Sequence, residues 1–159
     1  MRRSIRWWTA SADGALSRGV SVFDERHPGV ARLHGDLRAA LRAAARDAAA
    51  DGVTFYVNGG WRSPDYQTRL LRKATAKYGS AREAARWVAT AETSAHVTGD
   101  AVDIGSFDAR AWLSEHGPAY GLCQIYANEP WHFELRPDAR AHGRPPLYPD
   151  PSHDPRRRR

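Results

Sequence analysis

The chain has 159 residues, of which 42% are hydrophobic and 26% are charged, a composition typical of one folded domain and unlike that of a disordered chain. No apolar run approaches the roughly 20 residues that a membrane-spanning helix requires, so no membrane span is expected. The single cysteine, Cys123, excludes a disulfide framework or a multi-cysteine zinc finger within the chain.

The net charge of +6 at neutral pH would suit a nucleic-acid-binding protein, but the distribution of the charge argues against that class. Four of the charges lie in the terminal run 156–159, which leaves only two for the rest of the chain. A run of this kind is typical of a solvated tail. We therefore expect no nucleic-acid partner, and the oligomeric state stays open.

The amino-terminal residues Met1–Trp8 are basic but are followed by no apolar segment, so they do not form a signal peptide as the sequence stands. A cytoplasmic location is therefore expected, or an extracytoplasmic one if a leader has been removed. Turn-forming residues recur as far as Gly29, so residues 1–29 are expected to form an irregular segment that packs on the domain.

Periodicity and turn-forming residues divide the remaining chain into short helices and strands. Leucines four residues apart predict a helix, β-branched and aromatic runs predict strands, and serine caps followed by proline or glutamate predict helix starts. The expected helices cover 30–50, a segment beginning at Ser63, 81–90 and 107–116, and the expected strands cover 53–57, 101–104, 122–126 and 131–135. The last two strands are expected to form a hairpin, and this order of elements predicts an α+β fold. Residues 30–136 then form the main domain, and residues 137–159 form a tail rich in proline and arginine.

Two segments, 94–103 and 129–132, carry the residues that could do chemistry. A catalytic zinc ion needs three nitrogen or oxygen ligands and an open position for water, a set that His96, Asp103 and His132 would supply. Glu129 is then left over as a general base that could take a proton from the activated water. The same spacing also suits a capped turn, a salt-bridged aspartate and a core histidine, so the residues alone leave both interpretations open.

The pattern S-x-H-x-x-G-x-A-x-D over 94–103, followed by E-x-W-H over 129–132, resembles the D-alanyl-D-alanine metallopeptidases of the VanY/VanX type. A third block, 60–67, is similar to the family's G-Y-R-S-x-x-x-Q block, with Trp61 where tyrosine is usual. The blocks come in the family's order and lie within residues 53–135, about half of the chain. The resemblance implies a small zinc peptidase domain over 30–136, with a short antiparallel sheet and flanking helices, of the type shared with hedgehog proteins.

The resemblance also implies a role for each matching residue. His96, Asp103 and His132 would bind zinc, and Glu129 would be the catalytic base. Arg62 would stabilise the oxyanion that forms at the scissile carbonyl and would contact the substrate. Gln67 and Ser94 would hydrogen-bond the substrate near its terminal carboxylate, although a solvated helix residue and a local loop cap are the respective alternatives. Trp131 would form a wall beside the metal and the substrate.

The implied function is a zinc-dependent D,D-carboxypeptidase that hydrolyses the terminal D-Ala-D-Ala bond of peptidoglycan precursor peptides, using metal-activated water and Glu129 as general base. Pro130 after Glu129 favours the carboxypeptidase branch of the family. Three alternatives stay open: a D-Ala-D-Ala dipeptidase or dual enzyme, a phage-type peptidoglycan endopeptidase, and a non-catalytic hedgehog-like zinc-binding module. A role in glycopeptide resistance and a role in wall turnover are equally compatible with the residues.

Overall fold

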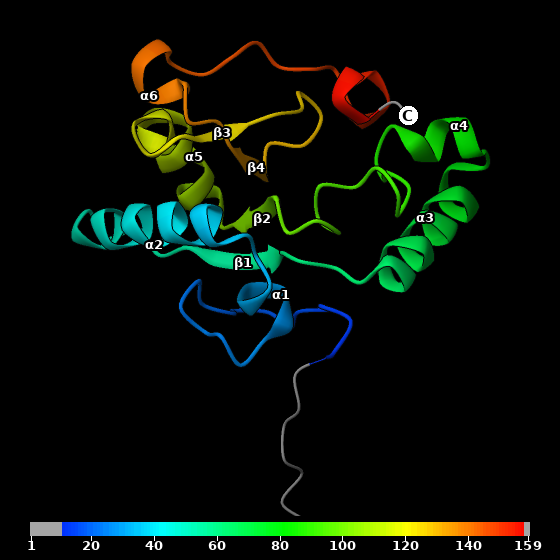
Figure 1. Ribbon diagram of the computed structural model, residues 1–159, viewed down its shortest axis with the longest axis horizontal. Helices are drawn as coiled ribbons and strands as arrows, with labels where there is room; N and C mark the ends of the chain where they lie inside the picture. Colours follow the sequence, from blue (N-terminus) through cyan, green and yellow to red (C-terminus); the bar gives the residue numbers. More distant parts are fainter. Residues whose placement is uncertain (1–10, 158–159) are drawn as a thin grey trace, which may run out of the picture.

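A four-stranded antiparallel sheet lies at the centre of the computed structural model, which describes residues 11–157 (Figure 1). The strands β1 (Tyr56–Gly59), β2 (Ala101–Gly105), β3 (Leu122–Gln124) and β4 (His132–Leu135) lie in the order β1-β2-β4-β3. The helices are α1 (Pro28–Ala31), α2 (Gly35–Ala50), α3 (Pro64–Tyr78), α4 (Ala81–Ala85), α5 (Phe107–His116) and α6 (Ala139–His142), with short 3-10 helices η1 (Gly117–Tyr120), η2 (Pro151–His153) and η3 (Pro155–Arg157). The predicted α+β fold with a short antiparallel sheet and the predicted hairpin of β3 and β4 are confirmed.

The two faces of the sheet differ in chemistry. Helices α2 and α5 cover one face, and the core between them is formed by buried apolar side chains that include Leu37, Leu41, Val57, Val102, Ile104, Leu113 and Phe133. Because successive strand side chains point to opposite faces, the residues between these apolar positions face the other way. Asp103 on β2 and His132 and Glu134 on β4 therefore share the second face. The apolar face holds the fold together, and the opposite face carries the polar residues.

Helices α3 and α4 begin at the serine caps that the sequence predicts. The Oγ of Ser63 accepts a hydrogen bond from Tyr66 N at 3.0 Å, and the Oγ of Ser80 accepts one from Glu83 N at 3.1 Å. Helix α4 ends at Ala85 instead of extending to about residue 90. The segment beyond it leaves the helical path, and the carbonyl of Ala89 accepts a hydrogen bond from a side chain on α3 instead.

The predicted helix over 30–50 is two helices, and the predicted strand over 53–57 is shifted. His34 separates α1 from α2 because its N–H donates to Gly99 O at 2.8 Å and its ring caps α2 at Asp36 N. The N–H of Val53 bonds to Ala48 O at the end of α2, so the sheet begins only at Tyr56 and includes Gly59. In the first case a long-range hydrogen bond, and in the second a local one, overrides the hydrophobic periodicity.

The predicted tail over residues 137–159 contains short helices in the part that the structure describes. The segment 137–157 forms α6, η2 and η3, crosses above β3 and β4, and ends beside α4 (Figure 1). Its Asp150 and Asp154 are 2% and 0% exposed, because arginines and other donors pair with these carboxylates. Arg156 and Arg157 thus make ionic contacts with buried carboxylates.

The segment before α1 contacts the outer edge of β1. Within residues 11–27 the chain forms turns, Val20 and Val22 are buried, and Val57 N donates to Val20 O at 2.9 Å. Residues 1–10, on which the targeting interpretation rests, and residues 158–159 lie outside the described residues. Among the described helices, none combines the length and the apolar character that crossing a membrane requires.

Candidate metal centre

The register of the sheet brings two candidate ligands together. Asp103 on β2 lies directly opposite His132 on β4, and His96 comes from the loop that leads into β2. Gly99 lets this loop turn, since its φ is +78° and a Cβ at this position would lie 2.6 Å from Arg32 O. One atom from each of the three candidate ligands lies within 4.8 Å of the other two. The fold of the backbone alone therefore brings the three residues close together.

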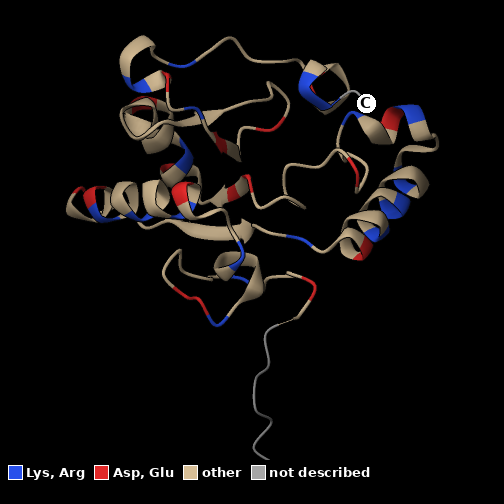
Figure 2. Cartoon of the chain, viewed as in Figure 1, with Lys and Arg blue, Asp and Glu red and all other residues tan. Residues whose placement is uncertain are grey.

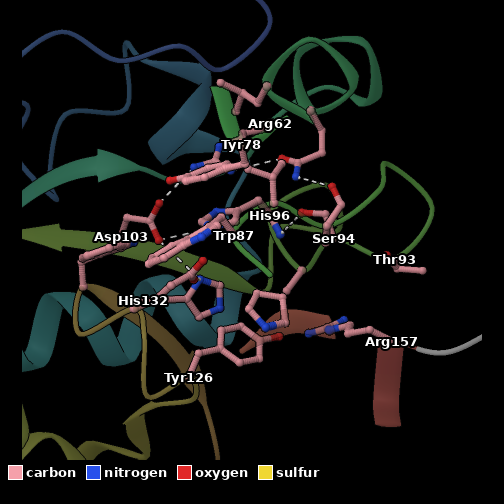
Figure 3. A pocket seen from close by; sticks show the side chains of 18 of the residues that line it. Arg62, Tyr78, Trp87, Thr93, Ser94, His96, Asp103, Tyr126, His132 and Arg157 are labelled. Atoms are coloured by element: carbon pink, nitrogen blue, oxygen red, sulfur yellow. Dashed lines mark hydrogen bonds and ion pairs between the residues drawn. The ribbon is translucent and has the colours of Figure 1, made fainter. Parts of the chain in front are cut away.

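The contacts of these three side chains match those of metal ligands (Figure 3). Asp103 Oδ1 lies 3.3 Å from His96 Nε2 and 3.4 Å from His132 Nδ1. Asp103 Oδ1 and His132 Nδ1 are buried and have no hydrogen-bond partner among residues 11–157. Buried polar atoms without partners are costly, and imidazole nitrogens with a carboxylate oxygen are a donor set that zinc accepts. The three residues therefore fit a zinc ion.

Each imidazole is oriented by a hydrogen bond from its other nitrogen. His96 Nδ1 lies 2.9 Å from Gly60 O, and His132 Nε2 lies 3.0 Å from Glu134 Oε1. Both acceptors are oxygens, so we assign the ring protons to these two nitrogens. The opposite nitrogens, His96 Nε2 and His132 Nδ1, face Asp103, and with a metal bound they would be the unprotonated, ligating nitrogens.

The electrostatics of the ligands also favour a cation. Burial alone would raise the pKa of Asp103, but the two imidazoles and the Arg62 guanidinium outweigh it and hold the pKa well below its ordinary value. Burial lowers the pKa of His96, and the positive charge of Arg62 adds to that effect. For His132, burial again lowers the pKa, but the Asp103 and Glu134 carboxylates outweigh it and raise it to about 9. A positive charge is therefore favoured beside Asp103.

Glu129 is a second carboxylate at the site and is not one of the three clustered ligands. It lies in the turn before β4, 6% exposed, with its Oε2 3.4 Å from His132 Nδ1. Burial raises its pKa to about 7, since the apolar surroundings disfavour the charged form and His132 offsets only part of this effect. A carboxyl group with a pKa near neutrality is suited to proton transfer at physiological pH.

Arg62 is held at the site by two side chains. Its Nη2 donates to Asp103 Oδ2 at 3.0 Å, and its Nη1 donates to Gln67 Oε1 at 3.1 Å. Gln67 is 1% exposed and its Nε2 donates to Ala89 O at 2.8 Å, so it is not a solvated helix residue. A Cβ at Gly59 would lie 2.8 Å from Arg62 Nη2 and 2.7 Å from Asp103 Oδ2, so a larger residue there would displace one of these two side chains.

Ser94 and Trp131 both line the cavity described below. Ser94 is 4% exposed, and its Oγ accepts a hydrogen bond from His96 N at 3.2 Å, which makes it a cap within the loop that carries His96. Trp131 is partly exposed, and its carbonyl accepts from Ile104 N at 2.9 Å. The backbone of Trp131 thus ties the turn before β4 to β2, while its side chain faces the cavity.

The clustered ligands lie in the wall of a cavity of about 400 Å³. The rings of Tyr78 and Trp87 stack at the cavity wall, with centroids 5.8 Å apart, and the guanidinium group of Arg157 approaches from the C-terminal segment (Figure 3). Glu134 and Arg157 were not predicted from the sequence as residues of the site. The sequence does place Glu134 two residues after His132, and this spacing in a strand puts both side chains on the same face of the sheet.

Comparison with known proteins gives a consistent set of relatives. A family model described as VanY, D-alanyl-D-alanine carboxypeptidase, matches residues 30–138. A D-alanyl-D-alanine carboxypeptidase of Enterococcus faecalis is 31% identical over an alignment of 109 residues, and the match covers 53% of this chain and 41% of that protein. The chain therefore spans about two-fifths of the length of this relative.

Solved structures resemble the chain in fold. A mutant of the vancomycin-resistance D,D-pentapeptidase VanY from a VanB-type cassette, in complex with Zn(II), has a TM-score of 0.61 and 26% identity, over 65% of this chain and 72% of that one. VanYB in complex with D-alanine-D-alanine gives the same score and identity, over 65% and 71%. The LD-carboxypeptidase LdcB has a TM-score of 0.64 at 21% identity, over 84% of this chain and 73% of that one, which shows a shared fold alone.

Proposed function

Because the chain belongs to the VanY family of D-alanyl-D-alanine carboxypeptidases, we propose that it is a zinc-dependent D,D-carboxypeptidase that hydrolyses the terminal D-Ala-D-Ala bond of peptidoglycan precursor peptides. One observation carries the proposal. Three ligand atoms lie within 4.8 Å of one another in the wall of an open cavity, and a separate buried carboxylate, Glu129, lies 3.4 Å from one of them.

Zinc held by His96, Asp103 and His132 would supply Lewis-acid chemistry, polarising the scissile carbonyl and lowering the pKa of water. The protein's own contribution begins with Glu129. Its carboxylate takes the proton of the attacking water and delivers it to the nitrogen of the departing D-alanine. Without metal, burial raises the pKa of Glu129 to about 7, and the charge of a bound zinc ion would favour the ionised form that accepts the proton.

Arg62 stabilises the negative charge that develops on the carbonyl oxygen of the scissile bond. A guanidinium already held by Asp103 and Gln67 is oriented before substrate arrives, so little reorganisation accompanies the reaction. Gln67 orients Arg62, since its oxygen and its nitrogen both have protein partners. Ser94 donates its hydroxyl hydrogen to the terminal carboxylate of the substrate, because its oxygen serves only as an acceptor in the loop.

The relatives support a substrate ending in D-Ala-D-Ala. One is a D,D-pentapeptidase, and another was solved in complex with D-alanine-D-alanine. The cavity opens to solvent beyond the candidate ligands, which leaves space for the donor part of a longer peptide. Trp131 forms one wall of this space, and Arg157 and Lys77 place positive charge around it.

The test measures D-alanine release by zinc-loaded protein from a muramyl-type pentapeptide, from free D-Ala-D-Ala and from a tetrapeptide ending in an L,D bond. Glu129→Gln is the catalytic variant, and Glu92→Gln, an exposed glutamate of the metal-binding loop, is the matched control. We expect release from the pentapeptide that falls about 10²–10⁴-fold in Glu129→Gln and stays unchanged in Glu92→Gln.

Release from free D-Ala-D-Ala in place of the pentapeptide would replace the proposal with a dipeptidase. Release from the L,D tetrapeptide alone would replace it with an L,D-carboxypeptidase. Zinc binding without release from any of the three would leave an endopeptidase or a non-catalytic zinc-binding module.

A further inference from the structure

Behind the candidate metal centre lies a buried ion cluster in which the C-terminal end of the chain meets the sheet. Glu134 is 3% exposed, and its Oε1 accepts the hydrogen bond from His132 Nε2 at 3.0 Å. On its other side, Glu134 Oε2 accepts from Arg156 Nη1 at 3.0 Å. Arg157 Nη2 lies 3.2 Å and 3.3 Å from the two carboxylate oxygens. Two guanidinium groups from the chain's end thus neutralise the carboxylate that orients a candidate zinc ligand.

The two arginines are themselves fixed by Asp154, which is completely buried. Arg156 makes a paired contact with it, from Nε to Oδ1 at 2.9 Å and from Nη2 to Oδ2 at 2.6 Å. Asp154 Oδ2 also accepts from the hydroxyl of Tyr126 at 2.7 Å. The ring of Tyr126 lies against that of His132, with centroids 4.9 Å apart. The end of the chain therefore reaches His132 twice, through Glu134 and through Tyr126.

The other end of this segment is attached to α4. Asp150 is 2% exposed, caps η2 through Ser152 N at 2.8 Å and accepts from Arg86 Nε at 3.4 Å. We call residues 150–157 the C-terminal clasp. In Figure 2 this segment lies beside the label C and carries blue positions, while red positions lie on the central strands. The clasp is anchored at both ends, so the position of its arginines is defined by contacts along its length.

We propose that the C-terminal clasp is a positioning element of the metal centre, which holds the Glu134 side chain in place so that His132 presents Nδ1 to the metal. The physical reason is the cost of burying a carboxylate. A buried carboxylate needs charged or hydrogen-bonding partners, so Glu134 without the two guanidinium groups would turn away and release the ring of His132. Carboxylates behind a ligating histidine fix its orientation and raise its basicity, and their loss typically lowers metal affinity 10- to 100-fold. The inference rests on the zinc site of the proposed function and assigns Arg156 and Arg157 to it as positioning residues.

The test measures the zinc dissociation constant of the full chain by chelator competition, together with the visible absorption spectrum of the cobalt-substituted protein. The variants are Glu134→Ala and the double variant Arg156→Gln/Arg157→Gln. The double variant Arg72→Gln/Arg82→Gln, which removes the same charge from exposed positions on α3 and α4, is the control. We expect zinc to bind about 10- to 100-fold more weakly in Glu134→Ala and about 10-fold more weakly in the arginine double variant. Both cobalt spectra should shift, and the control should match the unaltered protein.

Two further variants separate positioning from folding. Arg156→Lys/Arg157→Lys keeps the charge beside Glu134 and should recover most of the zinc affinity. Glu134→Gln keeps the shape and an acceptor for His132 but needs no cation, so it tests the proposal if the arginine double variant does not fold. We expect Glu134→Gln to bind zinc more weakly and to shift the cobalt spectrum.

The proposal is overturned if Glu134→Gln and the folded arginine variants bind zinc as tightly as the unaltered protein, with the same cobalt spectrum and only a lower melting temperature of the metal-free form. That result would make the clasp a purely structural element while leaving the proposed function intact. An unaltered protein that binds no zinc would instead overturn the proposed function, and this inference with it.

Discussion

The two imidazoles of the candidate metal centre face the same small space but are supported in different ways. His96 is oriented by a main-chain carbonyl, Gly60 O, at the end of β1. His132 is oriented by a side-chain carboxylate whose charge is balanced by the last described residues of the chain. The hydrogen bond that orients His96 comes from a neutral backbone group. The one that orients His132 comes from a charged side chain, whose own ion pairs join residues more than 20 positions apart in the sequence. We therefore expect different substitutions to disturb the orientation of His96 and the orientation of His132.

Replacing either histidine itself should weaken zinc binding to a similar extent, and this is the largest effect that we expect. His96→Ala and His132→Ala each remove one of three ligand atoms. We expect zinc affinity to fall in both by more than the about 10- to 100-fold that changes behind a ligand cost, and D-alanine release to be lost. Calorimetric zinc titration checks this expectation. A variant that kept stoichiometric zinc at unchanged affinity would remove that histidine from the ligand set.

On the His96 side, we expect replacement of Arg62 to lower the rate of the reaction more than it lowers the affinity for zinc. Arg62→Ala should lower kcat about 10²- to 10³-fold, since a charged donor at the developing oxyanion is lost. Steady-state kinetics on the pentapeptide measure this effect, with Arg69→Ala on the exposed side of α3 as the control. A change in KM with kcat unaffected would make Arg62 a substrate-binding residue without a role in the transition state.

On the His132 side, Asp154 should support stability through its charge. The pKa of Asp154 is lowered, because its hydrogen bonds to Arg156 and Tyr126 outweigh the effect of burial. The stabilisation is therefore present above the ordinary value of 3.8 and is lost as the pH falls through the lowered value. Asp154→Asn should be less stable at pH 7 by about 3 kcal/mol, as when one partner of a buried ion pair is removed.

Urea unfolding of the unaltered protein and of Asp154→Asn, at pH 7 and at acid pH, measures this difference. The gap in unfolding free energy should narrow in acid. A gap that stayed constant with pH would show that Asp154 stabilises the protein through packing alone.

The carbonyl that orients His96 belongs to Gly60, which is packed so closely that a larger residue there should destabilise the protein. A Cβ at Gly60 would lie 2.0 Å from Gly29 O, so Gly60→Ala must displace one of the two loops. We expect about 1–3 kcal/mol of destabilisation, typical of overpacking. Gly35→Ala, at a position with open space, is the control and should change the free energy by less than about 0.5 kcal/mol. Equal changes in unfolding free energy in the two variants would show that the close packing at Gly60 contributes nothing specific to stability.

The His96 half of the site is the part that the sequence could predict. Its candidate ligands lie in one contiguous motif, and β2, the cap at Ser63 and the start of α4 follow from local rules. The family predicted from the motifs is confirmed by the matching family model. Errors arose where a long-range hydrogen bond overrode a local pattern. His34 bonds to Gly99 and divides the predicted first helix, and Gln67 bonds to Arg62 and Ala89 within the protein.

The His132 half was only partly predictable, because its supports come from distant parts of the chain. The arginine run has no apolar periodicity, and a run of charges is usually solvated, so nothing local indicates that Asp154 is buried beside Arg156. The partner of that run, Glu134, lies 22 residues earlier. The sheet register that places Glu134 behind the site is fixed by pairing with β2 and β3, which a single sequence does not reveal.

The most direct test of the account is anomalous diffraction at the zinc absorption edge from crystals of the zinc-loaded protein. We predict one strong anomalous peak, bound by His96 Nε2, Asp103 and His132 Nδ1, with Glu129 beside the ion and not bound to it. A peak bound by Glu129 as a fourth protein ligand, or a zinc ion at another place in the molecule, would contradict the assignment of a catalytic zinc centre with Glu129 as its base.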